Sequence, residues 1–108
     1  MYFCDAANRP SKELSPGVWT RTFWQNNMLV SLLEFSANAI VPLHTHAEEQ
    51  VGIVLEGELY MTIGGETRLM KPGEAYIVPS NVEHGGRAGE KPVKVFDAFS
   101  PVRKEYRY

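Results

Sequence analysis

Histidine and glutamine side chains in this chain have the types and the spacing of a metal site. His44 and His46 lie one residue apart in an extended segment, so both imidazoles are expected on one face. Counting on by twos brings Glu48 and Gln50 to that face, and His84 follows a separate, turn-rich segment. Nickel, zinc, iron, manganese and copper all accept three imidazole nitrogens and one oxygen. The spacing therefore predicts a divalent metal site without choosing the metal.

The fourth ligand determines the charge of that site. Taken alone, a His-x-His pair is more often two solvated or hydrogen-bonded histidines than a metal site, so the surrounding residues carry the argument. Parity leaves Glu48 and Gln50, which share that face, as the candidates for the oxygen ligand, and Gln50 would give a site of neutral ligands only. Three neutral imidazoles and a neutral amide leave the charge of a divalent ion uncompensated by the protein. Such a site would be a strong Lewis acid and would attract an anionic substrate.

A second cluster of reactive residue types lies near the C-terminus. Asp97 and Phe99 are two residues apart on an expected strand and would project to one face, and Arg103 follows a proline bend. If that face lines the interior of the fold, a carboxylate, an aromatic wall and a guanidinium meet the metal at the mouth. The alternative is that Asp97 caps a turn and Arg103 is a solvated charge in the tail.

Two further segments carry weaker signals. Tyr76 has the same parity as His84 and is a candidate for lining the same cavity. The polar tail from Glu105 to Tyr108 has no role that the sequence indicates.

Short strands must position these side chains. Nine glycines and seven prolines interrupt the chain at short intervals, and the stretches between them are rich in β-branched and aromatic residues. Gly64-Gly65 predicts a tight hairpin with a primed turn. We expect one all-β domain, a sandwich or barrel, with an N-terminal arm over about residues 1–16, a barrel over about 17–100 and a short tail. The predicted strands are, approximately, Val18–Trp24, Met28–Phe35, Glu49–Leu55, Leu59–Ile63, Glu74–Val78 and Val93–Phe99.

Two of these strands, Met28–Phe35 and Glu49–Leu55, are apolar on both faces. A strand with one face in water should alternate apolar and polar residues. Both faces are therefore expected to be covered, and we predict that a second subunit in a homodimer provides the second cover. The alternative is that terminal segments fold back over the sheet.

Composition excludes several classes of protein. The 108 residues hold 11 basic and 13 acidic side chains without a basic block, so neither nucleic acid nor a membrane surface is an expected partner. The single cysteine, Cys4, excludes an intrachain disulfide. No apolar run approaches the roughly 18 residues of a membrane span, and the first residues lack the pattern of a signal peptide. We expect a cytoplasmic protein with a small-molecule substrate.

The two histidine-bearing segments resemble the two motifs of the cupin superfamily. From His44 to Gly57 the chain has two histidines one residue apart, an amide four residues after the second, and a glycine that opens a turn. Gly73–His84 resembles the second motif, with Asn81 in the place of a usual glycine. Asparagine also tolerates left-handed backbone angles. The resemblance implies a double-stranded β-helix, or jelly-roll barrel, that holds a metal ion.

Within the superfamily, the chain is most similar to the small cupins of pectin degradation. The similarity lies in the His-x-His motif, in Glu49-Gln50, in Ser15-Pro16-Gly17-Val18 and in an Asp-x-Phe-x-Pro-x-x-Arg pattern that starts at Asp97. Ala47-Glu48 departs from a proline and a histidine that the group often has. The similarity implies a set of metal ligands, and a set of substrate-binding and catalytic residues. These are His44, His46, Gln50 and His84 for the metal, and Asp97, Phe99 and Arg103 for the substrate and catalysis.

That family linearises the 4,5-unsaturated uronate monosaccharides that lyases release from pectin and alginate, and the product is the open-chain 5-keto-4-deoxyuronate. In this chain Asp97 would move protons, Arg103 would bind the uronate carboxylate, and Phe99 would pack on the sugar ring. Two alternatives stay open: a cupin-type metal-dependent dioxygenase, and a non-catalytic module that binds a metal or a sugar.

Overall fold

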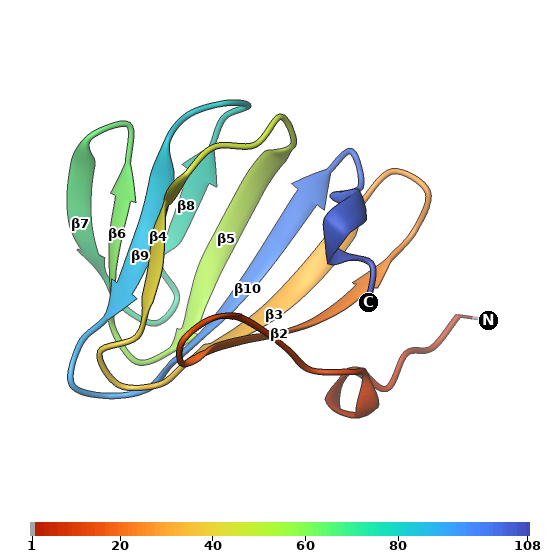
Figure 1. Cartoon of the computed structure of the whole chain (residues 1–108), viewed down its shortest axis with the longest axis horizontal. Coiled ribbons are helices and arrows are strands. Elements are labelled where there is room, and N and C mark those ends of the chain that lie inside the picture. Colours follow the sequence, from red (N-terminus) through yellow and green to blue (C-terminus); the bar gives the residue numbers. More distant parts are fainter. Residues whose placement is uncertain (1) are drawn as a thin grey trace.

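Two facing antiparallel sheets account for most of the chain (Figure 1). The structure is a computed structural model that describes residues 2–108. One sheet has six strands in the order β1-β2-β3-β10-β5-β8, and the other has four in the order β4-β9-β6-β7. This is a jelly roll, so the all-β prediction is confirmed. No helix among the described residues is long and apolar enough to cross a membrane. The elements are η1 (Ala6–Asn8), β1 (Lys12–Ser15), β2 (Val18–Trp24), β3 (Leu29–Phe35), β4 (Ile40–His44), β5 (Glu49–Glu56), β6 (Leu59–Ile63), β7 (Glu66–Met70), β8 (Ala75–Val78), β9 (His84–Ala88), β10 (Val93–Ser100) and η2 (Lys104–Tyr106).

All six predicted strands are present, and their ends differ from the prediction by no more than one residue. The hairpin is also confirmed, because Gly64 and Gly65 both have positive φ angles, 56° and 82°. Asn81 has a φ of 63°, in the left-handed region as expected.

Strands β1, β4 and β9 were not among the predicted ones, and β7 was predicted only as the second arm of the hairpin at Gly64-Gly65. Strand β1 lies in the predicted N-terminal arm and pairs with β2, so the sheet begins near Lys12 rather than near residue 17. Strand β9 contains Gly85-Gly86, which resembles a turn in sequence. A Cβ on Gly85 would lie 2.7 Å from the carbonyl oxygen of Val41 in β4, so glycine allows the close approach of these two strands.

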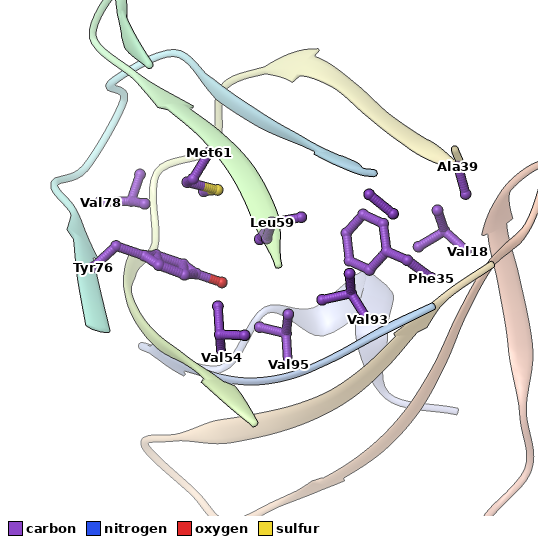
Figure 2. Close-up of a cluster of buried hydrophobic side chains, with 11 residues drawn as sticks. Val18, Phe35, Ala39, Val54, Leu59, Met61, Tyr76, Val78, Val93 and Val95 are labelled. Carbon is purple, nitrogen blue, oxygen red and sulfur yellow. The ribbon is translucent and has the colours of Figure 1, made fainter. Parts of the chain in front are cut away.

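The core lies between the sheets and is filled from both (Figure 2). Val54, Leu59, Val93 and Val95 are almost completely buried there, and each contributes about 1.5–3 kcal/mol by leaving water. The inward face of β10 carries Val93 and Val95, then Asp97 and Phe99. The apolar core therefore gives way to a polar site along one strand.

The outer face of the six-stranded sheet remains open over β5 and β8. Val51 is 52% exposed, Leu55 48% and Ile77 71%. The terminal helix η1 packs against β2, at the other side of the sheet. The apolar pattern of β5 predicts that both of its faces are covered. Within residues 2–108, the terminal segments do not cover the outer face of β5.

Candidate metal centre

Three histidine side chains converge at one end of the space between the sheets. His44 is the last residue of β4, His46 lies in the loop of residues 45–48, and His84 is the first residue of β9. The ring centroids of His44 and His84 are 4.3 Å apart, and those of His46 and His84 are 4.7 Å apart. One nitrogen from each ring lies within 4.8 Å of the other two. The cluster that the spacing predicts is therefore formed, although its members come from two strands and a loop.

Backbone carbonyls determine which nitrogen of each ring faces the centre. The Nδ1 atom of His44 lies 2.8 Å from the carbonyl oxygen of Pro42, and Nδ1 of His84 lies 2.8 Å from that of Val82. Nδ1 of His46 lies 2.9 Å from the carbonyl oxygen of Glu48. A carbonyl oxygen only accepts, so each neutral ring carries its hydrogen on Nδ1. Each Nε2 then presents a lone pair, which is the form that binds a metal.

The free lone pairs face one another at short range. Nε2 of His46 lies 3.1 Å from Nε2 of His84 and 3.0 Å from Oε1 of Gln50. With Nδ1 protonated, all three of these atoms are acceptors, and acceptors at this distance repel one another unless a cation lies between them. Three imidazole nitrogens and an amide oxygen suit a first-row divalent ion. The residues present therefore fit a metal ion.

The route by which Gln50 reaches this centre differs from the prediction. The parity argument treats His44 to Gln50 as one extended segment, but β4 ends at His44, residues 45–48 form a bend, and β5 begins at Glu49 in the other sheet. Gln50 is buried and points inward from β5. The carboxylate of Glu48 lies 3.7 Å from Nδ1 of His46, on the side of the ring opposite Nε2. Gln50, not Glu48, therefore places a side-chain oxygen beside the Nε2 atoms of the histidines.

Burial favours the neutral forms of His44 and His84 in the metal-free site. Desolvation lowers the pKa of His84 to about 4, helped by His44, His46 and the charge of Arg103, while the bond to Val82 opposes the shift. Desolvation also lowers the pKa of His44. Ligand nitrogens must be unprotonated, so these shifts favour metal binding at neutral pH.

Asp97 is the buried carboxylate of the site. It points inward from β10, is 2% exposed, and accepts a hydrogen bond of 2.5 Å from the hydroxyl of Tyr76. Desolvation raises the pKa of Asp97 to about 6, although hydrogen bonds from Tyr76 and Gln50 and the charge of Arg103 oppose the shift. A carboxyl group with this pKa can both donate and accept a proton near neutral pH.

Arg103 and two aromatic rings line the mouth of the same cavity. The guanidinium lies 3.9 Å from the ring centre of Tyr106 and 5.4 Å from that of Phe99. Its buried Nε lies 3.5 Å from the Glu105 carboxylate but makes no hydrogen bond among the described residues. Stacking therefore holds the guanidinium in place at the mouth of the cavity.

The sequence did not indicate Tyr106. Its carbonyl accepts a hydrogen bond of 2.5 Å from Thr22, and Arg9 donates to the carbonyl of Tyr108, so the tail is fastened across β2. The ring of Tyr106 packs edge-on against Phe99 and lines the cavity. No pattern in residues 105–108 could reveal this, because the contact depends on where the tail folds back.

The chain belongs to the cupin family. A sequence model described as Cupin domain matches residues 31–99, a span that includes all four candidate metal ligands. The structure of an RmlC-like cupin from Shewanella frigidimarina superposes with a TM-score of 0.91 over 98% of this chain and 96% of that one, at 22% identity. That likeness supports the jelly-roll fold.

Two further matches are proteins of one kind. The chain is 31% identical over 107 residues to the pectin degradation protein KdgF of Dickeya dadantii. The matched residues make up 97% of this chain and 96% of that protein. It is also similar to the structure of KdgF from Halomonas sp., with a TM-score of 0.87 and 26% identity over 97% of this chain and 96% of that one. Among cupins, the chain is therefore similar to those of pectin degradation.

Proposed function

We propose that this cupin is a metal-dependent enzyme that converts a 4,5-unsaturated uronate monosaccharide into the linear 5-keto-4-deoxyuronate. One observation carries the proposal: a buried carboxyl group, Asp97, and a stacked guanidinium, Arg103, line the same cavity as His44 and His84, two members of the three-histidine cluster. The similarity to two KdgF proteins, one of which is described as acting in pectin degradation, supports the same class of substrate.

Arg103 and Phe99 would bind the sugar at the mouth of the cavity. The enclosed part measures about 40 Å³, which holds only a few water molecules. The sugar ring must therefore occupy the open end, against the faces of Phe99 and Tyr106. There the planar guanidinium of Arg103 can pair with the uronate carboxylate through two hydrogen bonds.

Asp97 would supply and recover the proton. The uronate has an alkene between C4 and C5 beside its carboxylate. A proton goes to C4, a water oxygen adds at C5, and the water gives up one proton in return. In the resulting hemiketal the C5 hydroxyl gives up its proton and the ring oxygen gains one as the bond between C5 and the ring oxygen breaks, which leaves a ketone at C5 and opens the ring. Asp97 can give the first proton and take back the one from water, so it ends each cycle unchanged.

His44, His46, His84 and Gln50 would hold the divalent ion. When bound, that ion supplies a Lewis acid that polarises the substrate or its water. The four neutral ligands leave its positive charge uncompensated by the first coordination sphere, and this favours an anionic substrate beside Arg103.

The non-catalytic alternative would be favoured by an Asp97 that faces away from the cavity. Asp97 instead lines it, which supports an enzyme. Oxygen consumption in place of uronate turnover would point to a dioxygenase.

Turnover of 4,5-unsaturated galacturonate tests the proposal. Purified, metal-loaded protein should remove the ultraviolet absorbance of the conjugated alkene without consuming oxygen. Asp97→Asn should abolish this activity, whereas Asp5→Asn, the same change at an exposed residue, should keep it. Decay at the spontaneous rate with metal bound would reject this substrate and leave the metal site intact.

We also propose that the protein is a homodimer formed through the outer face of the six-stranded sheet. The strand register aligns one apolar row across five strands of that face. The row consists of Ile77, Val51, Ala98, Val30 and Phe23. A continuous apolar face of this kind marks an interface.

A second copy suits this face because the charges around it have both signs. Arg21 pairs with Glu34 at 3.8 Å and Lys94 pairs with Glu56 at 3.9 Å. A two-fold axis can therefore bring two such faces together without like charges meeting. Sedimentation should give twice the chain mass for wild type and one chain mass for Val51→Lys. Leu69→Lys, a partly exposed leucine on the other sheet, should remain a dimer, and a monomeric wild type would reject the proposal.

A further inference from the structure

Tyr76 is a buried residue whose hydroxyl has no part in the chemistry described above. It lies on β8, is 7% exposed, and points into the core with its hydroxyl directed inward (Figure 2). The hydroxyl donates to Oδ1 of Asp97 at 2.5 Å. A buried hydroxyl needs a partner, so this bond satisfies Tyr76. The same bond also restrains the orientation of the Asp97 carboxylate.

The absence of a side chain at Gly52 makes this contact possible. Gly52 is paired with Tyr76 of β8 on one side and with Asp97 of β10 on the other. The two side chains therefore reach toward each other over the middle strand, β5. A Cβ on Gly52 would lie 2.2 Å from Oδ1 of Asp97 and 2.4 Å from Cζ of Tyr76. Any larger residue would separate the pair.

Asp97 in turn contacts the candidate metal ligand Gln50. Gln50 and Asp97 line the same cavity from the neighbouring strands β5 and β10, and Gln50 is close enough to Asp97 to lower its pKa. Because Oε1 of Gln50 is directed at His46, the amide nitrogen is the end that faces the carboxylate, which only accepts. The amide oxygen then turns toward the histidines, where Oε1 lies 3.0 Å from Nε2 of His46. Rotation of the amide by half a turn would direct its NH₂ group at the metal, and an amide NH₂ group has no lone pair with which to bind a metal ion.

We propose that Tyr76 is a positioning residue that fixes the carboxylate of Asp97 and, through Asp97, keeps the amide oxygen of Gln50 directed at the metal. The inference rests on the metal site of the proposed function but not on the identity of the substrate. It assigns Tyr76, Asp97 and Gln50 to one hydrogen-bonded chain in which each member limits the orientation of the next.

Zinc affinity, measured by competition with a chromophoric chelator, tests this chain without any substrate. Tyr76→Phe keeps the ring and removes the hydroxyl. Partners behind metal ligands typically change metal affinity by about 10–100-fold, and Tyr76 acts through one further residue, so we expect about a tenfold loss. Tyr60→Phe is the matched control, because Tyr60 packs under Arg87 and does not line the cavity. Its affinity should equal that of wild type.

A double-mutant cycle shows whether Tyr76 acts through Asp97. Asp97→Ala removes the acceptor for both neighbours, so Tyr76→Phe should cause no further loss of zinc affinity in that background. An equal loss in both backgrounds, or no loss in Tyr76→Phe, would overturn the inference.

Two spectroscopic and binding controls separate the possible failures. The absorption spectrum of the cobalt-substituted protein should change in Tyr76→Phe and stay unchanged in Tyr60→Phe, because only the first alters the ligand field. A wild-type protein that binds neither metal would overturn the metal site itself, and this inference with it. A protein that binds zinc but does not act on unsaturated galacturonate would reject the substrate and leave the role of Tyr76 standing.

Discussion

Asp97 should reduce the stability of the metal-free protein. Its pKa rises from 3.8 to about 6 on folding, chiefly because burial disfavours the charged form. Near pH 7.5 the folded state must therefore hold an ionised carboxylate in a buried position. A difference of about two pKa units corresponds to about 3 kcal/mol. Asp97→Asn removes that cost and should stabilise the metal-free protein.

Part of this gain is lost to a rearranged hydrogen bond. Asparagine has one acceptor oxygen where aspartate has two, so its NH₂ group would face a neighbouring donor, the amide nitrogen of Gln50. Reorienting one of the two amides to restore a donor–acceptor pair costs about 1 kcal/mol. The net stabilisation is then about 2 kcal/mol near pH 7.5, which corresponds to a rise in Tm of about 8 °C or more for a domain of this size.

The sign of the pH dependence distinguishes this explanation from simple repacking. Below about pH 3.8 both states of wild type are protonated, so the cost is absent. Between about pH 3.8 and 6 the folded state binds the extra proton, and the stability of wild type falls as pH rises. Thermal unfolding in chelator should therefore show Asp97→Asn more stable near pH 7.5, with no advantage near pH 4. A variant that is less stable near pH 7.5, or a difference independent of pH, would refute the reasoning.

Three further perturbations follow from the same geometry. Gly52→Ala should lower the free energy of unfolding by about 3 kcal/mol or more in a urea titration, since overpacking costs about 1–3 kcal/mol and separation of the Tyr76 hydroxyl from Asp97 adds about 1–3 kcal/mol; wild-type stability would contradict the contact. Arg103→Lys should raise KM for unsaturated galacturonate about tenfold, with a smaller change in kcat, because lysine lacks the planar fork; an unchanged KM would remove Arg103 from substrate binding. Metal at about 100 times its Kd should stabilise the protein by about 2.7 kcal/mol in thermal unfolding, and His84→Ala should lose this gain, whereas an equal gain in the variant would place the metal elsewhere.

The inward face of β10 shows how far alternation can predict a site. A period of two placed Asp97 and Phe99 on one side of an expected strand, and both do line the cavity. The same rule failed between His44 and Gln50, because it assumes a continuous strand and the chain bends at residues 45–48. The rule still selected a residue that lies beside His46, because Gln50 also points inward after the bend.

Glycines were the least informative residues in the sequence. Gly64-Gly65 predicted its turn because two positive φ angles are a local requirement. Gly52 carried no such signal, because its role depends on Tyr76 and Asp97, which reach it from two other strands. Gly85-Gly86 resembled a turn and proved to be part of β9.

The sequence by itself determined what depends on local pattern: the class of fold, the ends of six strands, and the residue types of a candidate metal site. Strand periodicity and turn chemistry act over a few residues, so they can be read without coordinates. Only the tertiary structure decided the close approach of His46 to His84, the contact of Tyr76 with Asp97, and the position of Tyr106 beside Arg103. Each of these joins residues from separate segments, and burial and hydrogen bonding between such segments exist only once the two sheets have come together.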